Sequence, residues 1–304
     1  MNLLYDLLYF AKFRIPTVEG NTYTIKNPWV LFKKTGKIKL TDGQIFYFNE
    51  KNKKNVLDLV LFILSTGIHF GRGKYQWKFN NKREYIETHQ GVRFKLHGIG
   101  ILDETFLKQV HFAGFNLEGK VVITGGAYIG DTPLFYASYG AKVIAFEPDP
   151  ISFKIAMENI SLNPRFKKLI TLVPYAIGKD VIVKFPLEKD SGGSSIFKIN
   201  TQKTISVRSM SISSILKEFN INNPYLLDLD IKGAEFEVIK DESVAKFKKV
   251  RIEYSPYLLK NTKNISLSFL LQKLQEYQFN KIRIYKHNDL RFDLLNHGTI
   301  EAEK

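Results

Sequence analysis

The chain has 304 residues, of which 44% are hydrophobic and 13% aromatic, enough apolar material to fill one large core or two ordinary ones. It contains no cysteine, which excludes a disulfide framework, a cysteine zinc site and cysteine nucleophile chemistry. Its 45 basic and 30 acidic residues give a net charge of +15, which attracts nucleic acid, anionic lipid or acidic glycans. A solvated, lysine-rich surface is the simpler interpretation of this excess.

Neither a signal peptide nor a membrane span is predicted. Met1 to Phe13 is apolar, but it carries Asp6 and lacks a basic lead and a small-residue cleavage site. The longest apolar stretch, Val56 to Phe70, contains Asp58 and is shorter than the roughly 20 residues that cross a bilayer. We interpret it as a buried helix or strand pair. Together with the missing cysteines, these features predict a cytoplasmic protein.

The pattern of the chain changes near residue 118, which we predict as a domain boundary. Residues 1–118 are expected to form a smaller α+β region that serves as an accessory or substrate-binding part. Within it, Thr41-Asp42-Gly43 joins two strand-like runs at 37–40 and 44–48, and its Asp-Gly pair favours a tight hairpin turn. Residues 119–304 are expected to form the main domain.

Short apolar runs alternate with amphipathic stretches after residue 118, as in a series of βαβ units. The predicted strands are 120–124, 142–147, 169–177, 225–231 and 249–255, and the predicted helices are 131–139, 150–162, 233–242 and 266–277. The end of the chain, 281–285 and 290–295 around 287–289, predicts a hairpin that adds an antiparallel strand. The alternation indicates an α/β fold with a mostly parallel sheet.

A glycine-rich turn follows the first of these strands. In Gly125-Gly126-Ala127-Tyr128-Ile129-Gly130 a buried strand leads into a turn and then a helix, which lets the backbone approach a ligand closely. The next strand ends at Glu147, 21 residues after Gly126, where nucleotide-binding folds place an acid that holds the ribose hydroxyls. The alternative is structural: Glu147 as a surface acid and Asp149 as a helix cap.

The turn fits S-adenosylmethionine (SAM) better than a dinucleotide. A dinucleotide fingerprint places glycine where the backbone must approach a pyrophosphate, whereas the bulky Tyr128 stands within this turn. SAM has no phosphate, so it does not require that approach. The sequence therefore predicts SAM as the cofactor.

Four blocks in order resemble the FkbM-type SAM-dependent methyltransferases. They are Gly126–Thr132, Phe146–Pro150, Ala176–Gly178 and Asp230–Glu235, within residues 118 to 255. The resemblance implies a Rossmann-like class I methyltransferase sheet. It also implies transfer of a methyl group to oxygen, typically to a hydroxyl of a sugar, glycan or polyketide-like acceptor.

The resemblance and the turn together give the expected cofactor residues. They are Thr124, Gly126, Ala127, Tyr128, Gly130, Asp131, Glu147, Pro148, Ala176 and Asp228. Two positions depart from the family pattern, which usually has Asp where Thr124 stands and Glu where Lys232 stands. Asp131 and Asp228 are candidates to offset the missing charge at Thr124.

Methyl transfer is an in-line displacement in which the acceptor must lose a proton, so carboxylates near the strand ends are candidate bases. These are Asp230, Glu253 and Glu235. The alternatives are that Glu235 complements a helix dipole and that Glu253 is the buried partner of Arg251 or a lysine. Asp230 and Glu253 sharing a divalent metal ion is not favoured, because no third ligand is evident.

Three functions stay open at this point. The first is an O-methyltransferase acting on a carbohydrate or a similar acceptor. The second is an RNA methyltransferase whose basic N-terminal region, with Tyr75, Trp77 and Phe79, binds nucleic acid. The third is a non-catalytic binding protein on a methyltransferase fold.

Two further features of the sequence receive no definite assignment. Residues 191–195 suggest either a substrate lid or a plain hairpin connection, and the six scattered histidines receive no role.

Overall fold

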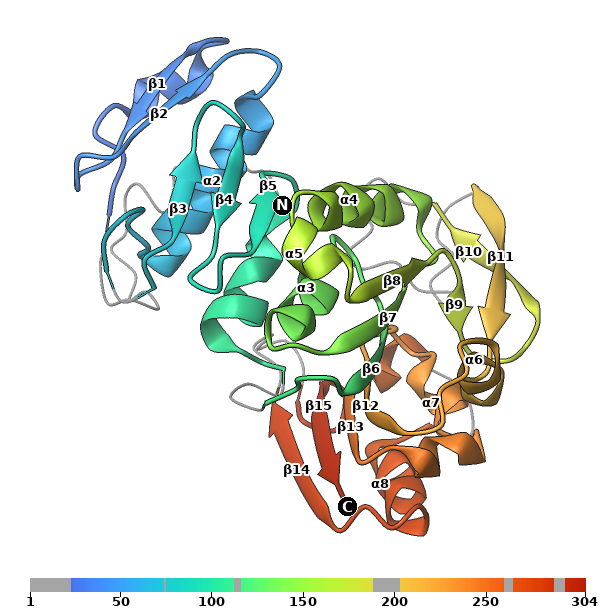
Figure 1. The fold of residues 1–304 in the computed structure, drawn as a ribbon. Coiled ribbons are helices and arrows are strands. Elements are labelled where there is room, and N and C mark those ends of the chain that lie inside the picture. Colours follow the sequence, from blue (N-terminus) through green and yellow to red (C-terminus); the bar gives the residue numbers. More distant parts are fainter. Residues whose placement is uncertain (1–22, 74, 112–115, 188–202, 260–264, 287–292) are drawn as a thin grey trace. The chain divides into compact units, whose positions relative to one another are not determined.

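The computed structural model describes residues 23–73, 75–111, 116–187, 203–259, 265–286 and 293–304 (Figure 1). The chain divides into two compact units, Met1–Gly114 and Phe115–Lys304. The start of the chain up to residue 22, the 191–195 segment and the turn expected at 287–289 lie outside the described residues. Within the described part of the chain, no helix is long and apolar enough to cross a membrane.

The N-terminal unit packs one long helix against small sheets. The expected hairpin is confirmed: β1 (Gly36–Lys39) pairs antiparallel with β2 (Ile45–Phe48), and Gly43 takes the positive φ of 93° that its turn requires. The predicted apolar stretch forms α2 (Lys53–Thr66), which ends at Gly67 in the left-handed region. The remaining elements are η1 (Pro28–Phe32), β3 (Lys78–Asn80), β4 (Tyr85–Glu87), β5 (Arg93–Lys95), η2 (Ile99–Ile101) and η3 (Asp103–Lys108).

The aromatic residues that suggested a nucleic-acid platform belong largely to the core of this unit. Trp77 is fully buried and stacks on Phe62 of α2 with ring centroids 5.5 Å apart. Phe79 is half-buried and lies against Phe46 and Phe70. These side chains therefore stabilise the fold of the unit.

The C-terminal unit is built on a seven-stranded sheet of order β14-β15-β13-β12-β6-β7-β8. The five parallel strands are β6 (Val121–Gly125), β7 (Lys142–Phe146), β8 (Ile170–Val173), β12 (Pro224–Leu229) and β13 (Lys249–Tyr254). The last strand, β15 (Gly298–Glu303), runs antiparallel between β13 and β14 (Lys281–Lys286). The predicted α/β fold, a mostly parallel sheet with an antiparallel last strand, is confirmed.

Helices connect the parallel strands. They are α3 (Asp131–Ser138), α4 (Pro150–Ser161), α5 (Pro164–Lys167), α6 (Ile212–Glu218), α7 (Glu235–Val238), η5 (Glu242–Lys246), η6 (Pro256–Leu259) and α8 (Leu267–Glu276). Side-chain caps fix the starts of some of them: Asp149 accepts from the backbone N–H of Ser152 at α4, and Ser266 accepts from that of Phe269 at α8. The cap expected as the alternative role of Asp149 is thus present.

Two predicted elements differ from the structure in extent. The strand expected at 169–177 ends at Val173, because Pro174 has no backbone N–H to continue the ladder. Its last part, β9 (Ala176–Ile177), joins β10 (Ile182–Pro186) and β11 (Thr204–Met210) in a separate sheet. The helix expected at 233–242 is shorter: it begins only at Glu235, because Gly233 adopts a φ of 104°, and it ends at Val238, before the separate helix η5 that Asp241 caps.

The final strand also differs from the prediction. Residues 293–296 form a turn in which the Asp293 carboxylate accepts from the backbone N–H groups of Leu295 and Asn296. The strand expected at 290–295 is therefore wrong for its described part, residues 293–295, and the antiparallel strand β15 begins at Gly298.

A buried polar cluster crosses the middle of the sheet. The register places Asp228 of β12 between Thr124 of β6 and Arg251 of β13. Arg251 donates to Asp228 Oδ1 over 2.8 Å, and the Tyr136 hydroxyl of α3 donates to Asp228 Oδ2 over 2.5 Å. Burial, followed by the charge of Asp228, raises the pKa of Tyr136 well above its usual range. The cluster ties α3 to the two central strands.

We predict that Arg251→Met destabilises the fold by about 3 to 5 kcal/mol, because it leaves the buried Asp228 carboxylate without its cation. Urea unfolding monitored by circular dichroism gives the free energy. Arg283→Met is the matched control: Arg283 lies exposed on the edge strand β14, and its loss should cost less than about 0.5 kcal/mol. Equal losses for the two variants would contradict the assignment of Arg251 as the central buried cation.

Candidate active site

The glycine turn after β6 lies against the end of β12. The backbone N–H groups of Gly126 and Ala127 both donate to the Phe146 carbonyl of β7 over 3.0 Å. Gly126 has a φ of +84°, and a Cβ built there would lie 2.1 Å from the Asp230 carbonyl oxygen. Only glycine fits this position, because a side chain would collide with the Asp230 carbonyl. With glycine there, the turn holds the ends of β6, β7 and β12 close together.

The next part of the turn is fixed by Glu147. Tyr128 has a positive φ of 44°, which is uncommon for a bulky residue, and its backbone N–H donates to Glu147 Oε2 over 2.7 Å. Asp149 donates its backbone N–H to Glu147 Oε1 over 2.9 Å. One carboxylate thus holds both the glycine turn and the loop after β7.

The environment of Glu147 matches what a nucleoside ribose needs. Burial raises the pKa of Glu147 to about 8, although the hydrogen bonds from Asp149 and Tyr128 act in the opposite direction. Each oxygen of an ionised carboxylate has room for a further donor. Two ribose hydroxyls would satisfy these sites and stabilise the charged form. The residues present therefore fit a nucleoside cofactor such as SAM.

The other predicted cofactor residues divide by accessibility. Gly126, Tyr128, Pro148 and Ala176 are half-buried and can contact a ligand, whereas Thr124, Ala127, Gly130, Asp131 and Asp228 are buried. Both oxygens of Asp228 accept hydrogen bonds from Arg251 and Tyr136. Its role in offsetting the charge of SAM stays a prediction that this geometry does not favour.

Two of the three candidate bases are joined by a lysine. The Lys232 ammonium lies 2.7 Å from Asp230 Oδ1 and 2.8 Å from Glu253 Oε1. Burial alone would lower the pKa of Lys232, but the charges of Asp230 and Glu253 raise it well above its usual range. Lys232 is therefore a permanent cation that lies between the two carboxylates.

Glu253 is enclosed by two cations and a histidine. Besides Lys232, Arg251 Nη2 lies 3.6 Å from Oε2, and His297 Nε2 lies 3.4 Å from Oε1. Burial acts to raise the pKa of Glu253, but Lys232, His297 and Arg251 together hold it well below its usual range. Glu253 therefore has the surroundings of a buried ion-pair partner, which is the alternative to its role as a base. Asp230 is more open, with 34% of its side chain exposed.

Glu235 braces two loops. Its oxygens accept from the backbone N–H of Gly233 over 2.6 Å and from that of Ser255 over 2.8 Å. The side chain is fully buried, and burial raises the pKa of Glu235 to about 7. These contacts connect the loop after β12 to the end of β13, and they give Glu235 a structural task at the site.

Two residues of this site are not anticipated from sequence. Lys232 stands out in sequence only as a departure from the family pattern, not as the bridge between Asp230 and Glu253. His297 receives no role from sequence, because it precedes a strand that was expected elsewhere, and no local motif marks it. Among the residues that the structure describes, no group of three or more His, Asp or Glu side chains is placed to hold a metal ion.

The sheet order, the glycine turn after β6 and the acid after β7 define a Rossmann-like class I methyltransferase fold. The model of the methyltransferase FkbM domain matches residues 125–281, and the chain belongs to this family. Membership implies that SAM is the cofactor.

The individual proteins that resemble this chain match it over a short stretch or at low sequence identity. A curated tRNA(Phe) (4-demethylwyosine(37)-C(7)) aminocarboxypropyltransferase from Pyrococcus horikoshii is 33% identical over 92 residues, which are 29% of this chain and 33% of that protein. The chain thus matches about a third of the length of this relative. Among solved structures, the N-terminal domain of human METTL16 aligns with a TM-score of 0.42 and 13% identity, covering 98% of this chain and 93% of that one. The putative transferase PH0793 from Pyrococcus horikoshii aligns with a TM-score of 0.40 and 16% identity, covering 83% and 84%.

We predict that Gly126→Ala abolishes SAM binding, because the new methyl group would overlap the Asp230 carbonyl and push the turn away from β12. Calorimetric titration with SAM measures the effect. Gly119→Ala is the matched control: Gly119 also has a positive φ, of +69°, but a Cβ added there would have nothing within 4 Å. This variant should incur only the backbone strain of about 1 kcal/mol and bind SAM normally. Normal binding by Gly126→Ala would contradict the placement of the turn.

Proposed function

We propose that this protein transfers a methyl group from SAM to a hydroxyl oxygen of a sugar, a glycan or a related small acceptor. When bound, SAM supplies an electrophilic methyl group on its sulfonium. Family membership supports methyl transfer as the reaction class. The observation that supports a hydroxyl oxygen as the acceptor is the accessible carboxylate of Asp230 beside the glycine turn. A hydroxyl needs a base to take its proton, and Asp230 is the most accessible of the three candidate acids.

In this proposal the glycine turn and Glu147 bind the cofactor, and Pro148 and Ala176, which follow β7 and β8 in the chain, contact it. Glu147 receives the ribose hydroxyls on its two oxygens. The carboxyl ends of parallel strands are where open α/β sheets bind ligands, and Gly126, Glu147 and Asp230 all follow such ends.

Asp230 would accept the proton of the acceptor hydroxyl, and Lys232 would hold the Asp230 carboxylate in place. Glu253 anchors Lys232 from the other side, since it remains ionised over the whole neutral range. With its oxygens shared between Lys232, His297 and Arg251, Glu253 acts in this proposal as a positioning residue. Glu235 fixes the loop on which Lys232 lies.

RNA methylation is the second candidate, and two observations favour it. The net charge of +15 suits a polyanionic acceptor, and the curated relative is by its name an enzyme of tRNA(Phe). That relative is by its name an aminocarboxypropyltransferase, so the similarity does not indicate which group this chain would transfer to RNA. The buried Trp77 removes one of the aromatic side chains that first suggested a nucleic-acid platform.

We predict that Asp230→Asn lowers the rate of methyl transfer about 100- to 10,000-fold, because it removes the base while keeping the size of the side chain. The measurement is transfer of radiolabelled methyl from SAM to an array of monosaccharides and disaccharides, followed by mass spectrometry of the product. SAM affinity, measured by calorimetry, should change far less than the rate.

Glu158→Gln is the matched control, since Glu158 lies exposed on α4 and should not affect the rate. Methyl transfer by Asp230→Asn at the wild-type rate would overturn the assignment of the base. Absence of SAM binding by the wild-type protein would overturn the enzyme proposal itself. RNA retention on filters that weakens with salt, together with labelled RNA as the product, would favour the second candidate.

A further inference from the structure

One edge of the seven-stranded sheet carries exposed lysines. The five parallel strands and β14 run in one direction, so their starts meet at one edge, opposite the edge of Glu147 and Asp230. The antiparallel β15 ends at the same edge as these starts. Among the described residues, six of the seven strands have an exposed lysine there: Lys168 at β8, Lys142 at β7, Lys120 at β6, Lys248 at β13, Lys304 at β15 and Lys281 at β14. We call these six residues the lysine row.

Hydrogen bonds between the strands place one half of the row side by side. The backbone N–H of Lys142 donates to the Lys120 carbonyl over 2.8 Å. Val143, the residue after Lys142, donates to the Leu169 carbonyl over 2.8 Å, and Leu169 directly follows Lys168. These lysines therefore lie on neighbouring strands in the order of the sheet.

The other half of the row is connected in the same way. The backbone N–H of Lys248 donates to the Tyr225 carbonyl of β12 over 3.0 Å, and that of Lys304 donates to the Lys248 carbonyl over 3.2 Å. Tyr225 occupies the β12 position between the two halves. Its ring centroid lies 5.3 Å from Nζ of Lys120, so an aromatic ring is part of the row.

Few acids offset the row. The segments that form this edge within residues 119–304 are 119–120, 139–142, 162–169, 219–225, 239–249, 277–281 and 303–304. They contain eleven Lys and Arg and three acids, whereas the rest of residues 119–304 contains 16 basic and 17 acidic residues. One of the three acids, Glu303, lies opposite Lys281 and pairs with Lys249 over 3.3 Å, and a further acid, Glu118, directly precedes the first segment. The positive excess of residues 119–304 is therefore concentrated at this edge.

The row is long and linear. Adjacent strands lie roughly 4.8 Å apart, so seven strand positions extend over roughly 30 Å. A small anion would contact only part of such a row, whereas a chain of anions would contact all of it. A nucleic-acid backbone carries one charge per roughly 3.4 Å along each strand of a duplex, which is a comparable spacing. Like charges at neighbouring strand ends repel one another, and a polyanion would remove this repulsion.

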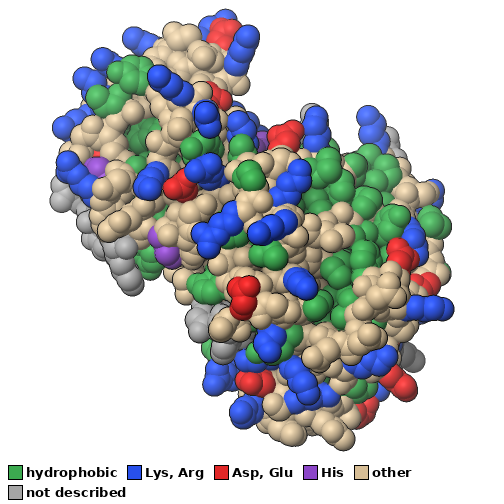
Figure 2. Space-filling model, in the orientation of Figure 1, with side chains coloured by type: hydrophobic (Ala, Val, Ile, Leu, Met, Phe, Trp, Pro, Cys, Tyr) green, Lys and Arg blue, Asp and Glu red, His purple; other side chains and the backbone are tan. Residues whose placement is uncertain are grey.

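We propose that the lysine row binds the phosphate backbone of a nucleic-acid strand. The half-buried Tyr225 ring provides the aromatic surface that nucleic-acid grooves combine with cations. A lipid surface would favour large apolar side chains beside the lysines, and within the described residues none of the exposed ones lies in the edge segments. On the face that Figure 2 shows, hydrophobic side chains of this unit gather over α4 and β10, and Lys and Arg side chains lie over β14 and β15.

The lysine row is separate from the candidate active site. β6 has five residues, so its two ends lie about 16 Å apart. A bound nucleic-acid strand would be anchored at the row, away from Glu147 and Asp230. The inference therefore does not depend on the proposed methyl transfer or on its acceptor.

Fluorescence anisotropy of the full chain with a labelled oligouridylate of about 20 nucleotides, long enough to span the row, tests the proposal. We expect binding at low salt, and the logarithm of the affinity should fall against the logarithm of salt concentration with a slope of about −4, as for six neutralised phosphates of a single strand. Lys120→Gln/Lys142→Gln and Lys248→Gln/Lys281→Gln should each reduce this slope by about 1.4 and weaken binding at least about fivefold.

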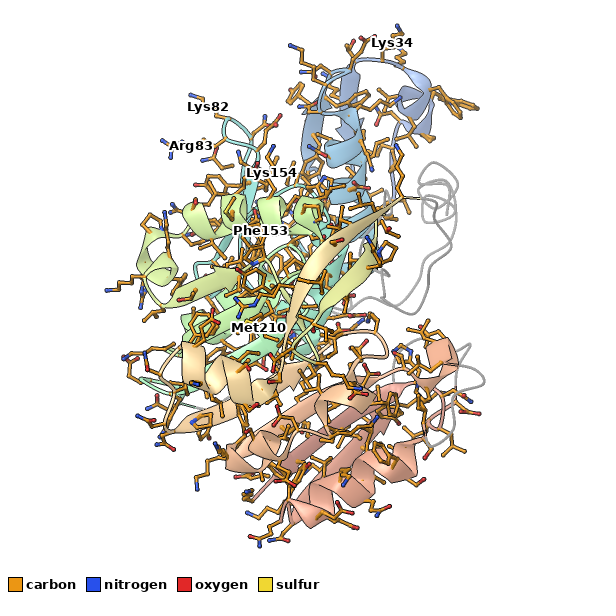
Figure 3. The ribbon with its side chains drawn as sticks, turned by 90° about the vertical axis from the view of Figure 1, so that its right-hand side faces the viewer. Lys34, Lys82, Arg83, Phe153, Lys154 and Met210 are labelled. Carbon is orange, nitrogen blue, oxygen red and sulfur yellow. The ribbon has the colours of Figure 1, made fainter. Side chains whose placement is uncertain are left out.

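Lys82→Gln/Arg83→Gln is the matched control. It removes the same charge from exposed positions at the β3–β4 turn of the N-terminal unit (Figure 3), and it should keep the wild-type affinity and slope. Circular dichroism should show all three variants folded, because the exchanged side chains are exposed. Equal loss in the control, or no oligouridylate binding at low salt, would overturn the proposal. Preferential binding to phosphatidylserine vesicles or to heparin would also overturn it and assign the edge to lipid or to an acidic glycan.

Discussion

The buried guanidinium of Arg251 is the interaction on which the rest of the C-terminal unit depends. It connects Asp228 in the middle of the sheet to Glu253 at the carboxyl end of β13, and Lys232 continues the series to Asp230, which is partly exposed. Positive and negative groups alternate along this path, so each buried charge has an opposite neighbour. Removing one member would leave its neighbour uncompensated, which is far more costly than the loss of a surface pair. The same series that stabilises strands β12 and β13 thus orients the open acid at their ends.

The glycine turn adds a second constraint at the same place. Gly126 lies directly against the Asp230 backbone, so in the proposed function the cofactor and the acceptor would meet at this point. Glu147 fixes the turn from the β7 side through its two backbone hydrogen bonds. In the proposed function the acids therefore have separate tasks: Glu147 receives the ribose, Glu253 anchors Lys232, and Asp230 remains accessible.

Features set by local sequence could be predicted, and features set by long-range packing could not. The glycine turn and the parallel strands follow from spacing and from the alternation of apolar runs, and they appear where they were expected except that β8 ends at Val173. Glu147 follows β7 as its spacing predicts, and its role in binding stays a prediction. The role of Lys232 depends on Glu253, 21 residues away, and on the positive φ of 47° that directs its backbone. His297 meets Glu253 because β15 pairs with β13 from Gly298 onward; the antiparallel strand was expected from sequence, but at 290–295, so His297 was not placed beside Glu253. Likewise, the lysine row depends on the order of the strands in the sheet, which no single segment specifies.

The central claim is that Glu147 receives the ribose of SAM, and calorimetric titration with SAM from about pH 6 to about pH 9 tests it most directly. The pKa of about 8 means that free Glu147 is mostly protonated at neutral pH, whereas two hydroxyl donors favour the ionised form. Binding should therefore release a proton, and affinity should rise by up to about tenfold per pH unit until about pH 8. Glu147→Gln should bind weakly and without this slope. No binding by the wild-type protein, or the same slope in the variant, would contradict the account.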